Sequence, residues 1–292
     1  MEFFIQYLFN GLVSGATYSL VSIGYAIPFY LKINNFAHGS TVVCGAFAGY
    51  ILMKYLGLPI VITGAIVIAL GIFIGVVIYY LVIKRVRKFK SWAVIVAGTL
   101  GVAIIIENLI LIFFGYEQFS IRMLLHNVQI RTFLGIYYSI IQLIILMCSI
   151  IILVIVFLVI NKTNLGLKFT TVTEDYDASY IMGISPERIS FVAFILGCTL
   201  ATFSGFLISF EYDLNYSSGY ILLLIAYTAT IIGGTKDLRK VTLVAYLIGI
   251  IEKIIGGYIT TEYMHASVFV ILIFFLLIKK EGLEKIYELR EV

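Results

Sequence analysis

The chain has 292 residues, of which 62% are hydrophobic and only 12% are charged, and its formal net charge is +4. A soluble globular domain has about 25% charged residues, so a water-soluble fold is excluded because it could not cover this much apolar surface. The basic residues lie in short loops beside apolar segments, where they set membrane orientation. The positive charge therefore does not indicate nucleic-acid binding.

Nine apolar segments are candidates for membrane-spanning helices. A bilayer core is about 30 Å thick and a helix rises about 1.5 Å per residue, so a span needs roughly 20 apolar residues. The segments are 3–31, 36–55, 59–83, 92–114, 136–160, 189–210, 220–232, 241–258 and 267–278. The seventh and ninth are short, which leaves open a re-entrant or buried position for them. Long apolar runs such as 136–160 exclude a β-barrel, whose strands alternate in polarity.

We therefore predict an all-α, polytopic helical bundle of about eight to ten spans, with residues 1–292 in one transmembrane domain. The first segment lacks a preceding basic stretch and a clear cleavage site, so we expect it to remain in the mature protein. Three cysteines, Cys44, Cys148 and Cys198, lie inside apolar segments without paired or metal-type spacing. We interpret them as small core residues.

The loop at 84–90 carries five basic residues, so the positive-inside rule predicts that it is cytoplasmic. Alternation of the spans then places three further segments on the cytoplasmic side: 161–188, 235–240 and the tail from residue 279. It places four segments outside: the N-terminus, 116–135, 211–219 and 260–265. The other basic residues near span ends then fall inside, which supports this topology: Lys162, Lys168, Arg188, Lys236, Arg239, Lys240, Lys279 and Lys280.

Pairs of small residues four positions apart recur in the spans. They are Gly11 with Gly15, Gly45 with Gly49, Gly71 with Gly75, and Ala201 with Gly205. This spacing places small residues on one helix face, so that neighbouring backbones can approach closely. It predicts close helix packing.

The longest predicted cytoplasmic loop, 161–188, carries the signals of a short helix. Three carboxylates lie near a plausible helix start, where they favour the helix dipole: Glu174, Asp175 and Asp177. Gly183 can end this helix, and Ser185 with Pro186 is typical of the start of the next span. On these residues alone, an amphipathic connector on the membrane surface is the favoured interpretation.

Two polar pairs lie inside apolar spans: Glu107 with Asn108, and Glu252 with Lys253. A buried charge costs at least ~2.5 to 3.5 kcal/mol unless it is paired or faces a polar cavity, so these residues are candidates for lining a pathway or pairing between helices. For Glu252, a local ion pair or a snorkelling neighbour is an equal alternative. Glu107 has no local partner, so it is paired across helices, protonated, or facing water.

His38 lies near a helix end, and we interpret it as a structural histidine because no second metal ligand stands at helical spacing. The sequence contains no phosphate-binding GxxxxGK[ST] loop, no HExxH and no nucleophile elbow. We therefore expect neither a cofactor in this chain nor enzyme activity. Uphill transport would draw its energy from an ion gradient or from another subunit.

Four segments in order resemble the membrane-spanning permeases of branched-chain amino acid ABC transporters. They are FNGLVSGATYSLVSIGYAI leading into INNFAHG with Asn35 to Gly39, then GVAIIIENLIL with Glu107 and Asn108, EDYDASYIMGISPERI, and IIGGTKDL followed by TTEYMHASVFVILI. One departure follows Gly233 and Gly234, where relatives usually have a Gly-, Ser- and Pro-rich turn. This chain has Thr235, Lys236, Asp237 and Arg239 there. The resemblance therefore does not predict the geometry of this loop.

The resemblance implies that the helix in loop 161–188 is a coupling helix seated in a groove of a cytoplasmic ATP-binding subunit, which would bind the ATP and Mg. Its residues would be Glu174, Asp175, Tyr176, Ala178, Ser179, Gly183 and Ile184. A second permease, expected to be a different chain, would complete the pathway, and an extracellular or periplasmic solute-binding protein would deliver the amino acid. Outer docking candidates are Glu211, Asp213 and Glu262.

The resemblance also implies a multi-pass protein of a prokaryotic cell membrane that transports branched-chain or related amino acids. Because related permeases serve amides, urea or other amino acids, the substrate is not legible from the residues. An ion-gradient-driven secondary transporter with Glu107 and Glu252 as carriers is the alternative. A membrane-embedded enzyme is disfavoured because no cluster of His, Cys or paired carboxylates stands at helical spacing.

Overall fold

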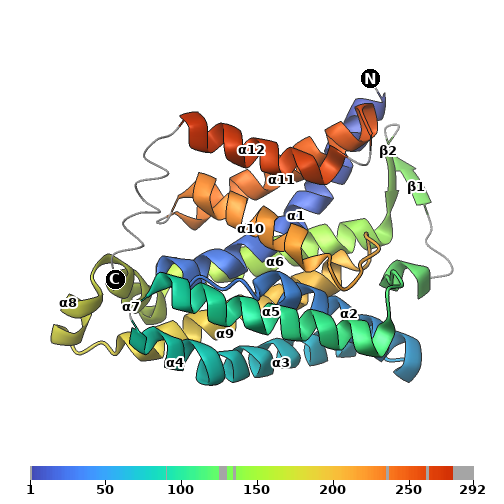
Figure 1. Cartoon of the computed structure of the whole chain (residues 1–292). Helices are drawn as coiled ribbons and strands as arrows, with labels where there is room; N and C mark the ends of the chain where they lie inside the picture. The colour runs from blue at the N-terminus through green and yellow to red at the C-terminus, as the bar shows by residue number, and fades with distance from the viewer. Residues whose placement is uncertain are drawn as a thin grey trace.

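The computed structural model describes residues 2–89, 91–124, 130–133, 136–234, 237–260 and 263–278, and these are almost entirely helical (Figure 1). Within these residues, seven helices are long and apolar enough to cross a membrane, and two shorter apolar helices accompany them. The nine are α1 (Glu2–Tyr30), α2 (His38–Leu56), α3 (Ile60–Ile78), α5 (Trp92–Phe114), α6 (Ile140–Lys162), α9 (Pro186–Ile208), α10 (Gly219–Gly233), α11 (Leu238–Tyr258) and α12 (Met264–Ile278). Each corresponds to one predicted segment, so the all-α polytopic prediction is confirmed.

The remaining elements are short. α3 continues through a π-helical turn (Tyr79–Ile83) into α4 (Lys84–Val86) and a 3-10 turn (Arg87–Phe89), and a second 3-10 turn covers Ile121–Leu124. The loop predicted to hold one helix holds two, α7 (Asn164–Glu174) and α8 (Tyr176–Ile181). Two strands, β1 (Ile130–Phe133) and β2 (Ile136–Ser139), form an antiparallel hairpin.

The predicted fifth span began too early, because residues 136–139 form β2 and the helix begins at Ile140. Ser139 and Gln142 make a reciprocal capping box: the Ser139 hydroxyl accepts from the Gln142 amide at 3.1 Å, and the Gln142 side chain accepts from the Ser139 amide at 3.0 Å. The residues before it, Ile-Tyr-Tyr, favour a strand because they are β-branched or aromatic.

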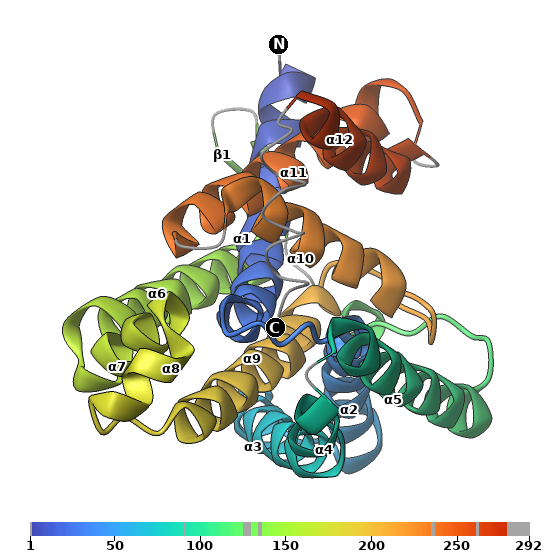
Figure 2. The same cartoon turned by 60° about the vertical axis from the view of Figure 1, so that its left-hand side comes forward.

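α1 is the centre of the bundle and is almost wholly buried. It packs against α6, α9, α10 and α11, and Figure 2 shows α6 with α7 on one side of it, α9, α3, α2 and α5 on another, and α11 with α12 on a third. Its serine and threonine hydroxyls donate to carbonyls of the same helix; for example, Ser22 donates to the Tyr18 carbonyl at 2.7 Å, whereas the Tyr18 hydroxyl reaches Tyr212 outside it. The helix therefore buries polar side chains without leaving them unpaired.

The paired small residues lie at the predicted close contacts. A Cβ added at Gly15 would lie 2.7 Å from the Tyr246 Cα of α11. One added at Gly45 would collide with the Thr202 carbonyl of α9, and one at Gly205 would collide with the Val42 carbonyl of α2. These glycines let the helix backbones touch, as the spacing predicted.

The loops separate into two groups at opposite ends of the bundle. At one end, the Tyr30 hydroxyl donates to the Gly234 carbonyl at 2.9 Å, and Arg87 donates to the Ser190 hydroxyl at 2.8 Å. At the other end, the Gln6 side chain donates to the Tyr137 carbonyl at 2.8 Å, and residues 119 and 214 are joined by a β-bridge. This grouping agrees with the predicted topology, while the side that faces the cytoplasm stays a prediction.

Candidate functional site

The connection between α1 and α2 is not helical, yet it lies inside the bundle. Asn34 and Asn35 are buried, and Lys32 has a positive φ of 62°. The Asn35 side chain accepts from the Ala37 amide at 3.1 Å, and the Thr99 hydroxyl of α5 accepts from the Phe36 amide at 3.1 Å. Buried non-helical backbone requires such partners, because its N–H and C=O groups are removed from water. This turn is therefore a polar joint between the first two spans that is largely buried, with Lys32 exposed.

His38 begins α2 and is completely buried. Its Nε2 lies 2.9 Å from the Val21 carbonyl oxygen, and its ring meets Tyr25 edge-on with the ring centroids 5.6 Å apart. Among the described residues, no group of three His, Cys, Asp or Glu side chains could hold a metal ion. His38 thus fastens the start of α2 to α1.

Glu107 is nearly buried on α5 and joins three helices. The Ser40 hydroxyl of α2 donates to its Oε1 at 2.8 Å, and Tyr220 of α10 lies beside the same carboxyl group. The neighbouring Asn108 is exposed and donates to the Ile104 carbonyl of its own helix at 2.8 Å. The predicted polar pair is therefore divided: Glu107 faces the other helices, and Asn108 faces away.

Glu252 belongs to a second polar cluster. It is fully buried on α11 and interacts with Tyr18 of α1. The Tyr18 hydroxyl donates to that of Tyr212 at 3.3 Å, and the Lys253 Nζ lies 4.4 Å from the Tyr212 ring centroid. Because Glu107 contacts α2 and α10 whereas Glu252 contacts α1, the two candidate carriers sit in different contact networks.

The three outer docking candidates have different environments. Glu211 is half-buried and accepts from the Gln142 side chain at 3.4 Å, whereas Asp213 is exposed. Burial raises the pKa of Glu211, although Gln142 and the nearby Lys253 oppose the shift. Glu262 lies outside the described residues.

The predicted coupling residues form α8 and its two ends. Glu174 ends α7, and Asp175 caps α8 by accepting from the Ala178 amide at 2.9 Å. Ser179 is buried and donates to the Tyr176 carbonyl at 2.7 Å. Gly183 ends the turn with a φ of +74°, a conformation that glycine adopts without strain, and the Ile184 amide donates to the Ser179 carbonyl at 3.0 Å.

The tip of α8 carries exposed side chains that the predicted coupling set left out. Ile181 is 90% exposed and Met182 is 60% exposed, and Tyr180 stands beside them. Apolar side chains this open, at a loop end of the bundle, are typical of a contact with another protein. A signal for them was present in the sequence, because they are the apolar residues that follow the capping carboxylates.

Arg87 connects α8 to the rest of the bundle. Its guanidinium lies 4.9 Å from the Tyr176 ring centroid, and it donates to the Ser190 hydroxyl at 2.8 Å and to the Leu31 carbonyl at 3.5 Å. Glu187, in the first turn of α9, accepts from the Tyr180 hydroxyl. A displacement of α8 would therefore act on both α9 and the α1–α2 joint.

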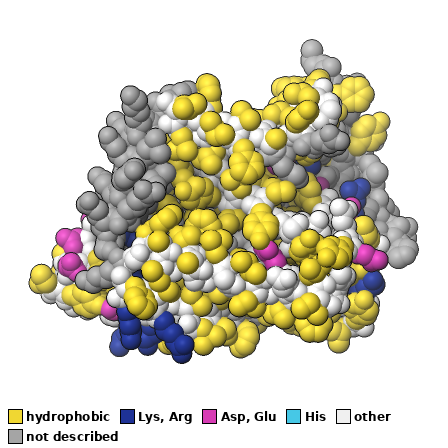
Figure 3. Space-filling model, viewed as in Figure 1, with side chains coloured by type: hydrophobic (Ala, Val, Ile, Leu, Met, Phe, Trp, Pro, Cys, Tyr) yellow, Lys and Arg dark blue, Asp and Glu magenta, His cyan; other side chains and the backbone are white. Residues whose placement is uncertain are grey.

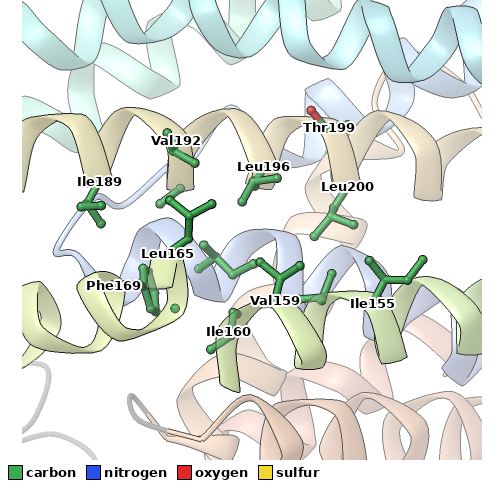
Figure 4. Close-up of a pocket in the computed structure, with 14 residues that line it drawn as sticks. Ile155, Val159, Ile160, Leu165, Phe169, Ile189, Val192, Leu196, Thr199 and Leu200 are labelled. Atoms are coloured by element: carbon green, nitrogen blue, oxygen red, sulfur yellow. The ribbon is translucent and has the colours of Figure 1, made fainter. Parts of the chain in front are cut away.

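An apolar groove opens between α6, α7 and α9 (Figure 4). Its lining includes Ile155, Val159, Phe169 and Leu196, and its one hydroxyl group, on Thr199, donates to the Ile195 carbonyl at 2.8 Å. The described lining of this groove has no charged group and no free hydroxyl that could bind a polar solute. The polar clusters around Glu107 and Glu252 are the better candidates for contact with one.

Comparison with known proteins gives one consistent result. Residues 7–278 match the family model described as branched-chain amino acid transport system / permease component. The high-affinity branched-chain amino acid transport system permease protein LivH of Escherichia coli K12 is 24% identical over 295 residues, covering 96% of this chain and 95% of the relative. The corresponding protein BraD of Pseudomonas aeruginosa is 25% identical over 297 residues, with the same coverage of both chains.

A solved structure described as PsaBC from Streptococcus pneumoniae in complex with Fab shares the fold. Its TM-score is 0.52 at 14% sequence identity, and the match covers 92% of this chain and 91% of that one. The arrangement of spans seen here therefore also occurs in a solved structure.

Proposed function

Because the chain belongs to the family of permease components of branched-chain amino acid transport systems, we propose that it is one permease subunit of an ATP-driven importer for branched-chain or related amino acids. The observation that carries this proposal is the family match over residues 7–278, which extends from the second turn of α1 to the end of α12. The protein is accordingly a multi-pass membrane protein. Its energy would come from ATP-binding subunits, since the sequence contains no phosphate-binding loop.

The assembly would contain three further kinds of protein. ATP-binding subunits would dock beneath α8 and hold the ATP and Mg, a second and different permease would complete the pathway, and a solute-binding protein would deliver the amino acid on the opposite side. The exposed tip formed by Tyr180, Ile181 and Met182 supports the first contact, because it offers apolar area to a partner groove.

Nucleotide-driven movement would reach the membrane through α8. Asp175 and Gly183 fix the two ends of this helix, so it can move as a rigid element. Arg87 and Glu187 would pass the movement to α9 and to the α1–α2 joint. The Thr99 hydroxyl links that joint to α5, the helix that carries Glu107. The mechanism is a two-state, rigid-body switch between helices.

The experiment compares two exposed isoleucines at opposite ends of the bundle. Ile181→Asp places a charge in the proposed ATPase contact, and Ile259→Asp is the control, because Ile259 follows the far end of α11 and is also exposed. The tagged chain is purified from its native membrane in mild detergent, and co-purifying subunits are identified by mass spectrometry. We expect the wild type and the control to retain ATP-binding subunits, and the Ile181 variant to lose most of them.

Uptake assays separate this proposal from the gradient-driven alternative. An ATP-driven importer keeps accumulating amino acid in proteoliposomes that contain an ionophore as long as ATP is supplied. Purification of the chain alone, with uptake that collapses under the ionophore, would establish a secondary transporter. Full recovery of ATP-binding subunits with Ile181→Asp would instead refute the docking role of α8.

A further inference from the structure

We propose that Glu107, Ser40 and Tyr220 form a binding site for the primary ammonium group of the transported solute, an inference that rests on the proposed import of amino acids. The three side chains come from α5, α2 and α10 and meet at the Glu107 carboxylate, to which the Ser40 hydroxyl donates and beside which Tyr220 lies. They meet where α2 and α10 begin. The two backbones touch there, since a Cβ added at Gly39 would collide with the Gly219 carbonyl.

The site lies at the edge of an open face. Tyr220 is 51% exposed, and Glu107, although nearly buried, retains 6% of its surface. Viewed as in Figure 1, the surface is hollowed between α12 above and α5 below, and acidic surface lies at the lower edge of the hollow (Figure 3). A solute in this hollow could reach the carboxylate after a small movement of the Tyr220 side chain.

The electrostatics of Glu107 favour a cationic ligand. Its contacts are two neutral hydroxyl groups, and among the described residues no lysine, arginine or histidine forms an ion pair with it. An ionised carboxylate inside a membrane protein is costly without a countercharge, and hydroxyl groups supply only part of the compensation. A ligand that brings a positive charge would remove this cost while it is bound.

A primary ammonium group matches the donors and acceptors that are present. It has three N–H donors and no acceptor, and the site offers three oxygen-bearing groups. The hydroxyls of Ser40 and Tyr220 can donate to the carboxylate and still accept from the ammonium through their lone pairs. The α-amino group of an amino acid has this form, whereas an amide or urea nitrogen has no charge to offer.

Apolar side chains next to the site suit a branched hydrocarbon. Leu223 lies beside Gly39 and one helical turn beyond Tyr220, and Phe36 and Tyr227 lie near each other with ring centroids 6.5 Å apart. The apolar groove shown in Figure 4 has no comparable polar partner. The Glu107 site thus combines a carboxylate, hydroxyls and nearby apolar surface, as a branched-chain amino acid requires, and it differs from the Glu252 cluster in that Lys253 already lies beside the latter.

The test uses the whole importer, purified with its partner subunits and reconstituted in proteoliposomes with L-leucine as the probe. Glu107→Gln keeps the size and hydrogen bonds of the side chain but removes its charge, Glu107→Asp keeps the charge, and Asn108→Ala is the control on the outward side of α5. We expect Glu107→Gln to lower the maximal rate of ATP-dependent uptake about tenfold, since a charged hydrogen bond is lost. ATP hydrolysis should persist, Glu107→Asp should recover part of the uptake, and Asn108→Ala should match the wild type.

Wild-type uptake by Glu107→Gln would overturn the inference and leave the proposed function intact, whereas a wild-type complex that takes up no leucine, isoleucine or valine would refute the proposed function itself. If the Glu107→Gln chain fails to assemble with its partner subunits, Ser40→Ala and Tyr220→Phe test the site instead, because both variants keep the carboxylate. Reduced uptake with normal assembly supports the site. Wild-type uptake by both variants assigns Glu107 to helix packing alone.

Discussion

Glu211 and Asp213 are two residues apart in one loop, yet their surroundings differ. Glu211 is half-buried against Gln142, and Asp213 faces solvent. Burial disfavours the charged form of Glu211 and raises its pKa above the usual value of a glutamate. The folded chain therefore binds this proton more tightly than the unfolded chain does, and stability falls as pH rises through the interval between the two pKa values.

This difference predicts the effect of removing each charge. At pH 7, Glu211→Gln should raise the unfolding temperature measured in detergent, because a partly buried charge is no longer desolvated. The gain should disappear near pH 4, where Glu211 of the wild type is protonated. Asp213→Asn is the matched control and should leave the unfolding temperature unchanged at both pH values. Equal unfolding temperatures for wild type and Glu211→Gln at pH 7 would show that burial costs this carboxylate nothing.

The unusual carboxylates inside the spans are evident in the sequence, but the side chains that contact them are not. Glu107 and Glu252 stand out because a carboxylate is rare in an apolar span. The Ser40 hydroxyl that donates to Glu107 is 67 positions away, and the Tyr18 that meets Glu252 is on the first span. Contacts of this kind depend on how helices are placed in space, which helical periodicity within one span does not specify.

At the level of elements, small residues fix how closely the helices approach. Gly205 of α9 lies against the Val42 carbonyl of α2, whereas Gly101 of α5 has open space where a side chain would begin. Both positions are helical, so the two glycines share their backbone conformation and differ in packing.

Replacing each glycine by alanine separates the effect of helix packing from the effect of backbone conformation. Gly205→Ala should lower stability by about 1 to 3 kcal/mol because α2 and α9 must move apart. Gly101→Ala should be neutral or should raise stability by up to about 1 kcal/mol, because alanine favours a helix. Thermal unfolding in one detergent measures both. A loss of equal size at Gly101 would assign the effect to the helix itself, not to the contact.

The elements were predicted well where one physical signal dominates. Long apolar runs yielded the nine apolar helices, and the carboxylates around Asp175 with the stop at Gly183 indicated a short helix where α8 lies, whereas α7 was not predicted. β2 was missed because Ile136, Tyr137 and Tyr138 extend a long apolar run that continues into a helix, which masks the strand preference of these three residues. The capping box at Ser139 was the local signal that could have placed the helix start.

At the scale of the whole molecule, the loops are grouped at two ends of the bundle. The orientation of the chain then depends on which end faces the cytoplasm. The five basic residues in 84–90 predict that the end that carries α7 and α8 faces the cytoplasm. Ile181 and Asp213 are suitable reporters, since both are exposed and lie at opposite ends of the bundle.

Labelling with a membrane-impermeant maleimide tests this orientation. In a background without Cys44, Cys148 and Cys198, a cysteine at position 213 should react in intact cells, because the reagent reaches it from outside. A cysteine at position 181 should react only after the membrane is permeabilised. The reverse pattern would invert the topology, and it would also place α8 on the wrong side of the membrane for an ATPase.

α10 is shorter than a bilayer is thick. It has 15 residues, follows Ser218 and ends before Gly234, whose φ is +85°. A helix of this length spans about 22 Å, against about 30 Å of hydrocarbon. It packs against α1, α2, α11 and α12, and Tyr220 is the one exposed residue among its 15. The neighbouring helices therefore carry the contact with lipid, so a change in membrane thickness places its mechanical load on them and reaches α10 only through their packing.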